Sequence, residues 1–181
     1  MKKMLKLILI LLIAIPVLLL VAGQAGLLRG TRPSDIGVNN HLLKPPGANS
    51  QNVVSSQAAL HPHTDYHLIA PLKLHGEPSA GSPAAGSPVA GSPVAGSPVA
   101  EFARLQKIVA GMPGSQIITS RPDYFHAEFE TKMLKFIDDV EFLLDADKGE
   151  IQMRSASRIG RKDFGVNRAR LEQIRAAFDA K

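Results

Sequence analysis

A long apolar run near the amino terminus limits the folds open to this chain more than any other feature. The run from Leu7 to Leu28 contains no charged residue. As a helix it would be about 33 Å long, enough to cross the hydrocarbon core of a bilayer. Lys2, Lys3 and Lys6 precede it, and the positive-inside rule keeps such lysines in the cytoplasm. We therefore expect residues 1–30 to be a membrane segment and the rest of the chain to lie outside the cytoplasm.

Two interpretations of this segment remain open. The first, which we favour, is an uncleaved anchor, because the run is long for the core of a signal peptide. The second is a signal peptide that is cut near VAGQA-G, with Gly23 and Ala25 as its small residues. Pro16 does not argue against a membrane helix, because such helices tolerate proline. The expected location is the cytoplasmic membrane, with a single pass and the N-terminus inside, or export after cleavage.

Composition excludes several classes of function. The chain has 181 residues, no cysteine and a net charge of +5. Without cysteine it can form no disulfide, thiol nucleophile, cysteine-bound metal site or lipoprotein anchor. A basic chain can bind nucleic acid, anionic lipid or an acidic partner, and a position outside the cytoplasm argues against nucleic acid. We expect contact with the membrane through the first helix and, beyond it, a small anion or an acidic partner. The sequence does not define the oligomeric state.

Turn-forming residues dominate the segment 31–77. The groups PSD, NN, PPG and NS interrupt any periodic pattern. We expect a loop-rich arm that packs on the body, with short strands near 52–55 and 68–74.

The arm contains the histidine-rich stretch HPHTDYH. If this stretch were a strand, alternation would place four possible metal ligands on one side of it: His61, His63, Asp65 and His67. Pro62 argues against a paired strand, and no second cluster of ligands is evident. We therefore favour a solvated polar loop and expect neither a metal nor another cofactor.

A five-residue unit, AGSPV with one AGSPA copy, repeats from Ala80 to Val99. Proline at every fifth position interrupts helices and strand pairing, and the repeat has no large side chain for a core. We expect residues 78–99 to be a low-complexity loop. A spacer or glycan-bearing stalk is possible, but we favour a tolerated expansion, because lengthening a surface loop costs little.

Residues 100–181 carry the regular patterns of a folded body. Helical spacing of apolar residues predicts a helix that ends at Pro113-Gly114 and a closing helix that includes Phe178. Between them, alternation predicts strands over 115–120, 124–131, 137–145 and 151–158. The expected fold class is α+β: an N-terminal membrane helix, a loop-rich arm, and then a helix, a four-stranded antiparallel sheet and a helix. We expect the helices to cover one sheet face and the other face to be partly exposed.

The register of the last two strands follows from keeping their apolar residues on one face. This condition pairs Phe142 with Met153 and places Glu141 directly opposite Arg154. An opposite-charge pair across two strands contributes up to about 1 kcal/mol. Arg154 therefore has a candidate partner inside the molecule.

Three segments resemble a known family: FIDDVEF (136–142), RSASRIGRKDFGVNRARLE (154–172) and NVVSSQ (52–57). They are similar to the family catalogued as domain of unknown function 1499, over nearly all of the chain outside the repeat. The resemblance implies an export or membrane segment and implies no activity. Members often carry cysteine at the position of Val53 and near Gly47. Both cysteines are missing here, which fits a dispensable disulfide better than a catalytic thiol.

The basic stretch from Arg154 to Arg168 is the main candidate for a binding site. Its serines and the amides around Gly160 and Gly165 could hold an anion, and Asn167 could cap a helix that starts at Arg168. The alternative, which we favour, is an internal network with the carboxylates Asp138, Asp139, Asp163 and Glu172. The candidate binding residues are Asp139, Glu141, Arg154, Ser155, Ser157, Arg158, Asp163, Asn167 and Arg168.

No catalytic residue can be assigned. The chain lacks a phosphate loop, a dinucleotide fingerprint and a metalloprotease motif. Asp138 and Asp139 would point to opposite faces of a strand and cannot act as a dyad. We favour a membrane-anchored binding or accessory module outside the cytoplasm. The alternatives are an enzyme that uses the motif with Asp163 or His126, which we expect to be a solvated surface residue, and a purely structural partner of a membrane complex.

Overall fold

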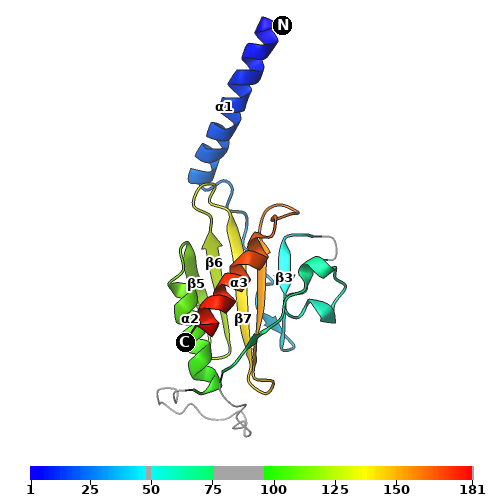
Figure 1. Cartoon of the computed structure of the whole chain (residues 1–181), viewed down its shortest axis with the longest axis vertical. Coiled ribbons are helices and arrows are strands. Elements are labelled where there is room, and N and C mark those ends of the chain that lie inside the picture. The colour runs from blue at the N-terminus through cyan, green and yellow to red at the C-terminus, as the bar shows by residue number, and fades with distance from the viewer. Residues whose placement is uncertain (48–49, 76–95, 181) are drawn as a thin grey trace.

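The computed structural model describes residues 1–47, 50–75 and 96–180. Helix α1 (Lys2–Gln24) projects from one end of a body that the rest of the chain forms (Figure 1). It is long and apolar enough to cross a membrane or to act as a signal anchor. The end of α1 touches the body, because Gln24 Nε2 donates to the Met133 carbonyl at 2.9 Å. A Cβ on Gly23 would lie 2.7 Å from the Leu134 carbonyl oxygen, so glycine allows this close approach.

The body is built on a six-stranded antiparallel sheet with the order β3-β8-β7-β6-β5, in which β4 also pairs with β8. The strands are β3 (Val53–Ser55), β4 (Leu72–Lys73), β5 (Ser115–Ser120), β6 (Tyr124–Glu130), β7 (Ile137–Asp145) and β8 (Glu150–Ser157). The α+β class is confirmed, but the prediction of four strands is wrong. The two additional strands come from the arm and pair along the outer edge of β8. They satisfy backbone groups that a sheet edge would otherwise leave open.

The predicted register of the β7–β8 hairpin is confirmed. Phe142 lies opposite Met153, and Glu141 lies opposite Arg154. Because side chains alternate along a strand, this register gives the sheet one apolar and one charged face.

Helices α2 (Pro98–Ala110) and α3 (Val166–Asp179) cover the apolar face (Figure 1). The largest fully buried side chains there include Phe102, Phe125, Phe142 and Phe178. The rings of Phe125 and Phe142 stack with centroids 4.6 Å apart. This core holds the strands in place and fixes which residues reach the opposite face.

Helix α2 begins inside the last copy of the repeat. Ser97 caps it by accepting from the Ala100 amide at 3.2 Å, and Pro98 occupies the first position, where no amide hydrogen is needed. The prediction that proline keeps the repeat out of helices is therefore wrong for this copy. Residues 80–95 of the repeat lie outside the described residues.

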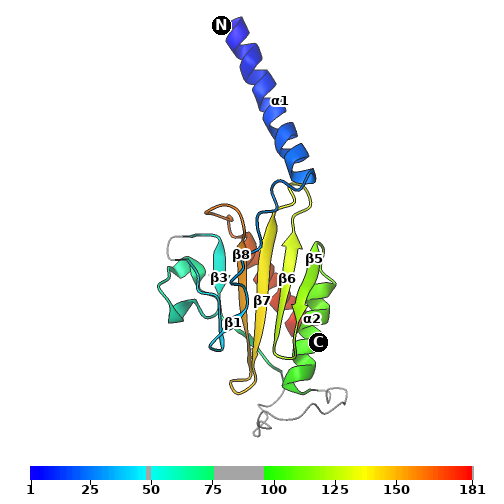
Figure 2. The same ribbon diagram turned by 180° about the vertical axis from the view of Figure 1, so that it is seen from behind.

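The charged face of the sheet is covered at β7, but it is partly exposed at its β5 edge, as expected, because Gln116 is exposed. The segment that follows α1 runs across it and includes the hairpin of β1 (Val38–Asn39) and β2 (Leu42–Leu43), as Figure 2 shows. Asp139 and Glu141 are only 2% and 0% exposed. The arm has no regular pattern that would reveal from sequence which surface it covers.

The histidine-rich stretch forms no strand. It lies between two short 3-10 helices, η1 (Ala58–Leu60) and η2 (Asp65–His67). His67 is fully buried rather than solvated, because Nδ1 accepts from the Thr64 amide at 3.0 Å and Nε2 lies 2.5 Å from the Ser50 carbonyl. Within 1–47, 50–75 and 96–180, no group of three His, Cys, Asp or Glu side chains could hold a metal ion.

Candidate functional site

The predicted site residues do not meet at one place, because the sheet separates them. Asp139, Glu141 and Arg154 lie on the face that the arm covers, and Arg158 reaches the same face from the end of β8. Ser155, Ser157, Asp163 and Asn167 meet on the helix face, at the start of α3. The Arg168 guanidinium donates to the Tyr66 carbonyl at 2.8 Å.

On the arm face, Glu141 is the centre of a buried hydrogen-bond group. Its Oε2 accepts from Arg154 Nη1 at 2.8 Å. Its Oε1 accepts from the Tyr124 hydroxyl at 3.0 Å and from the Gly37 amide at 2.9 Å. Burial and the neighbouring Glu141 carboxylate raise the pKa of Tyr124. Arg154 and Glu141 are therefore partners in an internal ion pair rather than groups that await a ligand.

A second buried carboxylate, Asp139, is held by two donors. His126 Nε2 lies 2.9 Å from Oδ1, and Arg158 donates through Nε at 2.8 Å and through Nη2 at 2.6 Å. Burial raises the pKa of Asp139, but the hydrogen bonds from Arg158 and His126 outweigh it and leave the pKa below its usual value. His126 is 1% exposed, so the interpretation as a solvated residue is wrong. The buried imidazole is therefore not accessible from solvent.

On the helix face, Asn167 does not cap α3. The helix begins at Val166, and Asn167 lies buried in its first turn. Asp163 takes the capping role, because its carboxylate accepts from the amides of Gly165 at 3.0 Å and Asn167 at 2.8 Å. The local reason is Gly165, whose φ of 86° is a conformation that glycine adopts readily.

The side chain of Asn167 also fills the space where an anion was expected. Its Nδ2 donates to Ser157 Oγ at 2.9 Å and to the Asp163 carboxylate at 2.7 Å, and its Oδ1 accepts from Ser155 Oγ at 2.5 Å. Arg170, in the same turn, pairs with Asp138. The basic residues in the first turn of α3 thus have their hydrogen-bond or ion-pair partners within the protein.

Tyr66 is a member of this cluster that sequence reasoning missed. Its hydroxyl donates to Asp163. Burial and the Asp163 hydrogen bond raise the pKa of Tyr66 to about 12. Burial raises the pKa of Asp163 in turn, but hydrogen bonds from Tyr66 and from the α3 amides leave it below its usual value. Tyr66 belongs to the irregular arm, so no periodic signal pointed to this contact.

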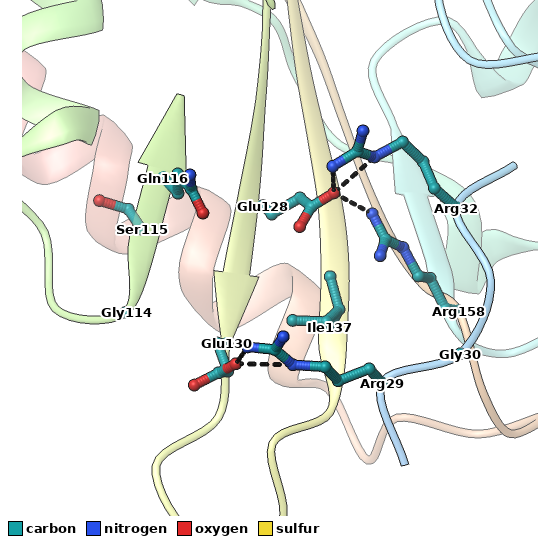
Figure 3. Close-up of a pocket in the computed structure, with 10 residues that line it drawn as sticks. All are labelled: Arg29, Gly30, Arg32, Gly114, Ser115, Gln116, Glu128, Glu130, Ile137 and Arg158. Carbon is teal, nitrogen blue, oxygen red and sulfur yellow. Dashed lines mark hydrogen bonds and ion pairs between the residues drawn. The ribbon is translucent and has the colours of Figure 1, made fainter. Parts of the chain in front are cut away.

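An open pocket of about 460 Å³ lies at the edge of the charged face (Figure 3). It is lined by Arg29, Gly30, Arg32, Gly114, Ser115, Gln116, Glu128, Glu130, Ile137 and Arg158. We call this hollow the rim pocket. It brings the segment directly after α1 against the ends of β5, β6 and β7, so it lies at the end of the body next to α1 (Figure 2).

Carboxylates and guanidinium groups alternate in the rim pocket. Arg29 Nε donates to Glu130 at 3.1 Å, Arg32 Nε donates to Glu128 at 2.6 Å, and Arg158 also pairs with Glu128. Burial raises the pKa of Glu128, but Arg158 and Arg32 outweigh it and hold the pKa below its usual value. Hydrogen bonds from Lys135 and Arg29 lower the pKa of Glu130. Both glutamates are therefore anions at neutral pH.

Each of the three arginines keeps one donor group unused. Within the part of the chain that the structure describes, Nη1 of Arg29, of Arg32 and of Arg158 has no hydrogen-bond partner in the protein. The side chains of Arg29 and Arg32 are 57% and 50% exposed. Of the pocket residues, only Arg158 is among the candidate site residues predicted from the sequence. The RGTR segment after the apolar run and the alternating Glu128 and Glu130 were the signals that could have indicated the others.

These features define a protein with an N-terminal helix able to cross a membrane and an α+β body whose charged sheet face is covered by the connecting arm. A family model described as "Protein of unknown function (DUF1499)" matches residues 42–178. The chain belongs to this family, as the resemblance indicated. No curated protein and no solved structure matches the chain. The family match includes Glu128, Glu130 and Arg158 and begins after Arg29 and Arg32.

Proposed function

We propose that the chain is a membrane-anchored binding module that acts outside the cytoplasm, and that the rim pocket binds a small ligand through an anionic group such as a phosphate or a carboxylate. The observation that carries this proposal is that three arginines line one pocket and that the Nη1 group of each has no partner among the described residues. Planar guanidinium groups suit oxyanions, because they donate in a fixed geometry and remain charged at all physiological pH values.

The charge balance of the rim pocket supports an anionic ligand. Among the residues that line it, three cations meet two carboxylates: Arg29, Arg32 and Arg158 against Glu128 and Glu130. One positive charge remains for a ligand. The deeper motif residues do not leave such an excess, because Glu141 and Arg154 form a buried ion pair with each other.

A purely structural accessory role is the second candidate. The observation that favours it is the internal pairing of Arg154, Arg158 and Arg170, which gives most of the motif a role in the fold. In that case the rim pocket would have no ligand, and the arginines would serve only to position the arm.

Thermal unfolding of the full-length protein in lipid nanodiscs separates the two roles. Inorganic phosphate is the probe, sodium chloride at equal ionic strength is the reference, and acetate tests for a carboxylate ligand. A ligand that binds the folded state raises the unfolding temperature in a concentration-dependent way. We expect this rise in the wild type and its loss in Arg32→Gln.

Arg121→Gln is the matched control for this experiment. Arg121 has the same 50% side-chain exposure as Arg32 and lies 3.9 Å from Asp123, outside the rim pocket. Its substitution removes one positive charge but should leave the response to phosphate unchanged. Absence of any response to phosphate and acetate in the wild type, or an equal response in Arg32→Gln, would overturn the proposal.

A further inference from the structure

Two loops lie at the same end of the body as α1, the β6–β7 loop (131–136) and the β8–α3 loop (158–165), as both overall views show (Figures 1 and 2). Direct contacts tie them to the membrane helix and the arm. Gln24 bonds the Met133 carbonyl, and a Cβ on Gly30 would lie 2.9 Å from Ile159 Cγ1. A bilayer that contains α1 therefore faces these two loops.

The loops carry exposed apolar side chains. Phe164 is 95% exposed, Met133 67% and Ile159 41%. Leu27, in the connection directly after α1, is 74% exposed. A phenylalanine with almost no protein contact is unusual when the other aromatic side chains of the chain are buried or half-buried. The exposed residues are continuous with the segment that enters the membrane, and this continuity identifies the bilayer as the surface that covers them.

The β8–α3 loop holds Phe164 outward by a fixed backbone. The Asp163 carboxylate binds the Gly165 amide, and the Asp163 amide donates to the Gln51 carbonyl at 3.1 Å. Gln51 in turn accepts this bond and donates its own amide to the Arg161 carbonyl at 2.8 Å. Phe164 itself has a φ of 53°, which is uncommon for a residue other than glycine. The loop therefore maintains an unfavourable conformation that presents a large apolar side chain.

Basic residues surround these apolar positions. Lys132, Arg161 and Lys162 are exposed, and Asp163, the acidic residue of the two loops, is buried under Tyr66. Basic side chains beside exposed aromatic and aliphatic ones are typical of surfaces that lie on anionic bilayers. A protein partner of mixed charge would not require this one-sided arrangement.

We propose that this end of the body is a second membrane-contact surface, at which Phe164, Met133 and Ile159 enter the bilayer interface while Lys132, Arg161 and Lys162 bind lipid phosphate groups. The surface holds the body against the bilayer and keeps the rim pocket close to the lipid headgroups. The inference rests on the membrane anchor of the proposed function but not on ligand binding in the rim pocket.

The absence of tryptophan from the chain gives a direct test. In Phe164→Trp the new side chain is the sole tryptophan, and Met133→Trp gives an independent reporter in the other loop. The matched control is Ala146→Trp, an exposed position in the β7–β8 turn at the opposite end of the body (Figure 1). Each full-length variant is reconstituted in phosphatidylcholine vesicles with and without brominated phosphatidylcholine, which quenches tryptophan that touches the acyl chains.

We expect the brominated lipid to quench Phe164→Trp and Met133→Trp several-fold more than Ala146→Trp. Equal quenching of all three would overturn the proposal, and so would blue-shifted emission of Phe164→Trp without quenching, because it would mean that protein covers the position. Flotation with the vesicles checks the anchor separately, so failure of the second surface is distinguishable from failure of α1 to hold the chain.

The basic residues are tested in the Phe164→Trp background. Phosphatidylglycerol added to the vesicles should increase quenching, and Arg161→Glu with Lys162→Glu should remove this increase. Quenching that is insensitive to both phosphatidylglycerol and the charge reversal would contradict the role given to the basic side chains.

Discussion

The two faces of the central sheet are made by alternate residues of the same strands, yet they are stabilised in different ways. On the helix face Phe142 stacks on Phe125 within a continuous apolar core. On the arm face its neighbour Glu141 is buried against Arg154. Apolar burial is non-directional and stabilises in proportion to area, whereas a buried charge is tolerated only while its partner is present. The charged face therefore serves mainly to fix the position of the segment that packs on it, and it adds less to the net free energy of unfolding.

What the charged face positions is the arm that follows α1. Glu130 holds Arg29, Glu128 holds Arg32, and Glu141 accepts from the Gly37 amide. These contacts lie in chain order along the arm, starting near α1, and attach it to β6 and β7. The core thus stabilises the body, and the charged face determines how the segment after α1 is attached to the body.

The largest effect should come from removing one member of the buried pair. Arg154→Met leaves Glu141 buried without its cation, and we expect a loss of about 3–5 kcal/mol in the free energy of unfolding. Phe142→Ala on the apolar face should cost a similar amount through its cavity. Chemical denaturation of the full-length protein in detergent measures both. A loss below about 1 kcal/mol for Arg154→Met, the range of exposed ion pairs, would mean that the charged face is effectively solvated.

The next largest effect on the free energy of unfolding should come from the polar cluster at the start of α3, and it depends on pH. Tyr66 has a pKa of about 12 in the folded protein, above its usual value of 10. Its contribution to stability is therefore complete below pH 10 and is lost as the pH rises toward 12. The pKa of Asp163 is lowered in the folded protein, so Asp163 contributes to stability at a pH above the usual aspartate pKa. This contribution is lost as the pH falls through the lowered pKa.

Tyr66→Phe tests this cluster. Hydrogen bonds to charged groups contribute about 1.5–3 kcal/mol, and we expect a loss of this order at neutral pH. The variant should lose less stability than the wild type between pH 10 and pH 12, and in acid below the usual aspartate range. Parallel stability curves for the two proteins at both ends of the pH range would show that the contact contributes nothing.

A smaller effect of opposite sign is expected at Phe164. Phe164 has a φ of 53°, a conformation that costs residues other than glycine about 1–2 kcal/mol. Substitution by glycine removes this cost, but part of the gain is lost because glycine gives the unfolded chain more conformational entropy. Phe164→Gly in detergent should therefore raise the free energy of unfolding by up to about 1 kcal/mol. A destabilised variant would indicate that the phenylalanine packs against the body.

The smallest effect should come from the outer edge of the charged face. Arg29 is 57% exposed, and exposed ion pairs contribute about 0–1 kcal/mol. Arg29→Gln should therefore lower stability by less than about 1 kcal/mol in the same denaturation assay. A loss as large as that of Arg154→Met would remove the distinction between the buried and the exposed parts of the face.

The body could be predicted from sequence where its pattern is periodic. Alternation in β7 and β8 predicted their extent and the opposition of Glu141 and Arg154, which the structure confirms. The same pattern cannot show what covers a face. Asp139 and His126 read as surface residues because polar side chains on a strand usually face water, and the irregular arm that buries them carries no periodic signal.

The candidate site was predictable only in part for the same reason. The stretch from Arg154 to Arg168 is a predicted site, but alternation along β8 places Arg154 and Ser155 on opposite faces. The placement of Asp163 and Asn167 depends on where β8 ends and on Gly165, which lets α3 start at Val166. Arg29 falls within the predicted membrane segment, residues 1–30, and Arg32 within the predicted loop-rich arm. Their contact with Glu128 and Glu130, across a large sequence separation, exists only in the folded chain.

A double-mutant cycle on Glu141 and Arg154 tests the central claim most directly, namely that the buried part of the arginine motif is internal structure. The variants are Arg154→Met, Glu141→Gln and their combination, and the measured quantity is the free energy of unfolding of each full-length protein. Glutamine keeps an oxygen for the Tyr124 hydroxyl and the Gly37 amide. The account predicts that the double variant is more stable than Arg154→Met alone, because it no longer contains an unpaired buried charge. Losses that simply add would contradict the account.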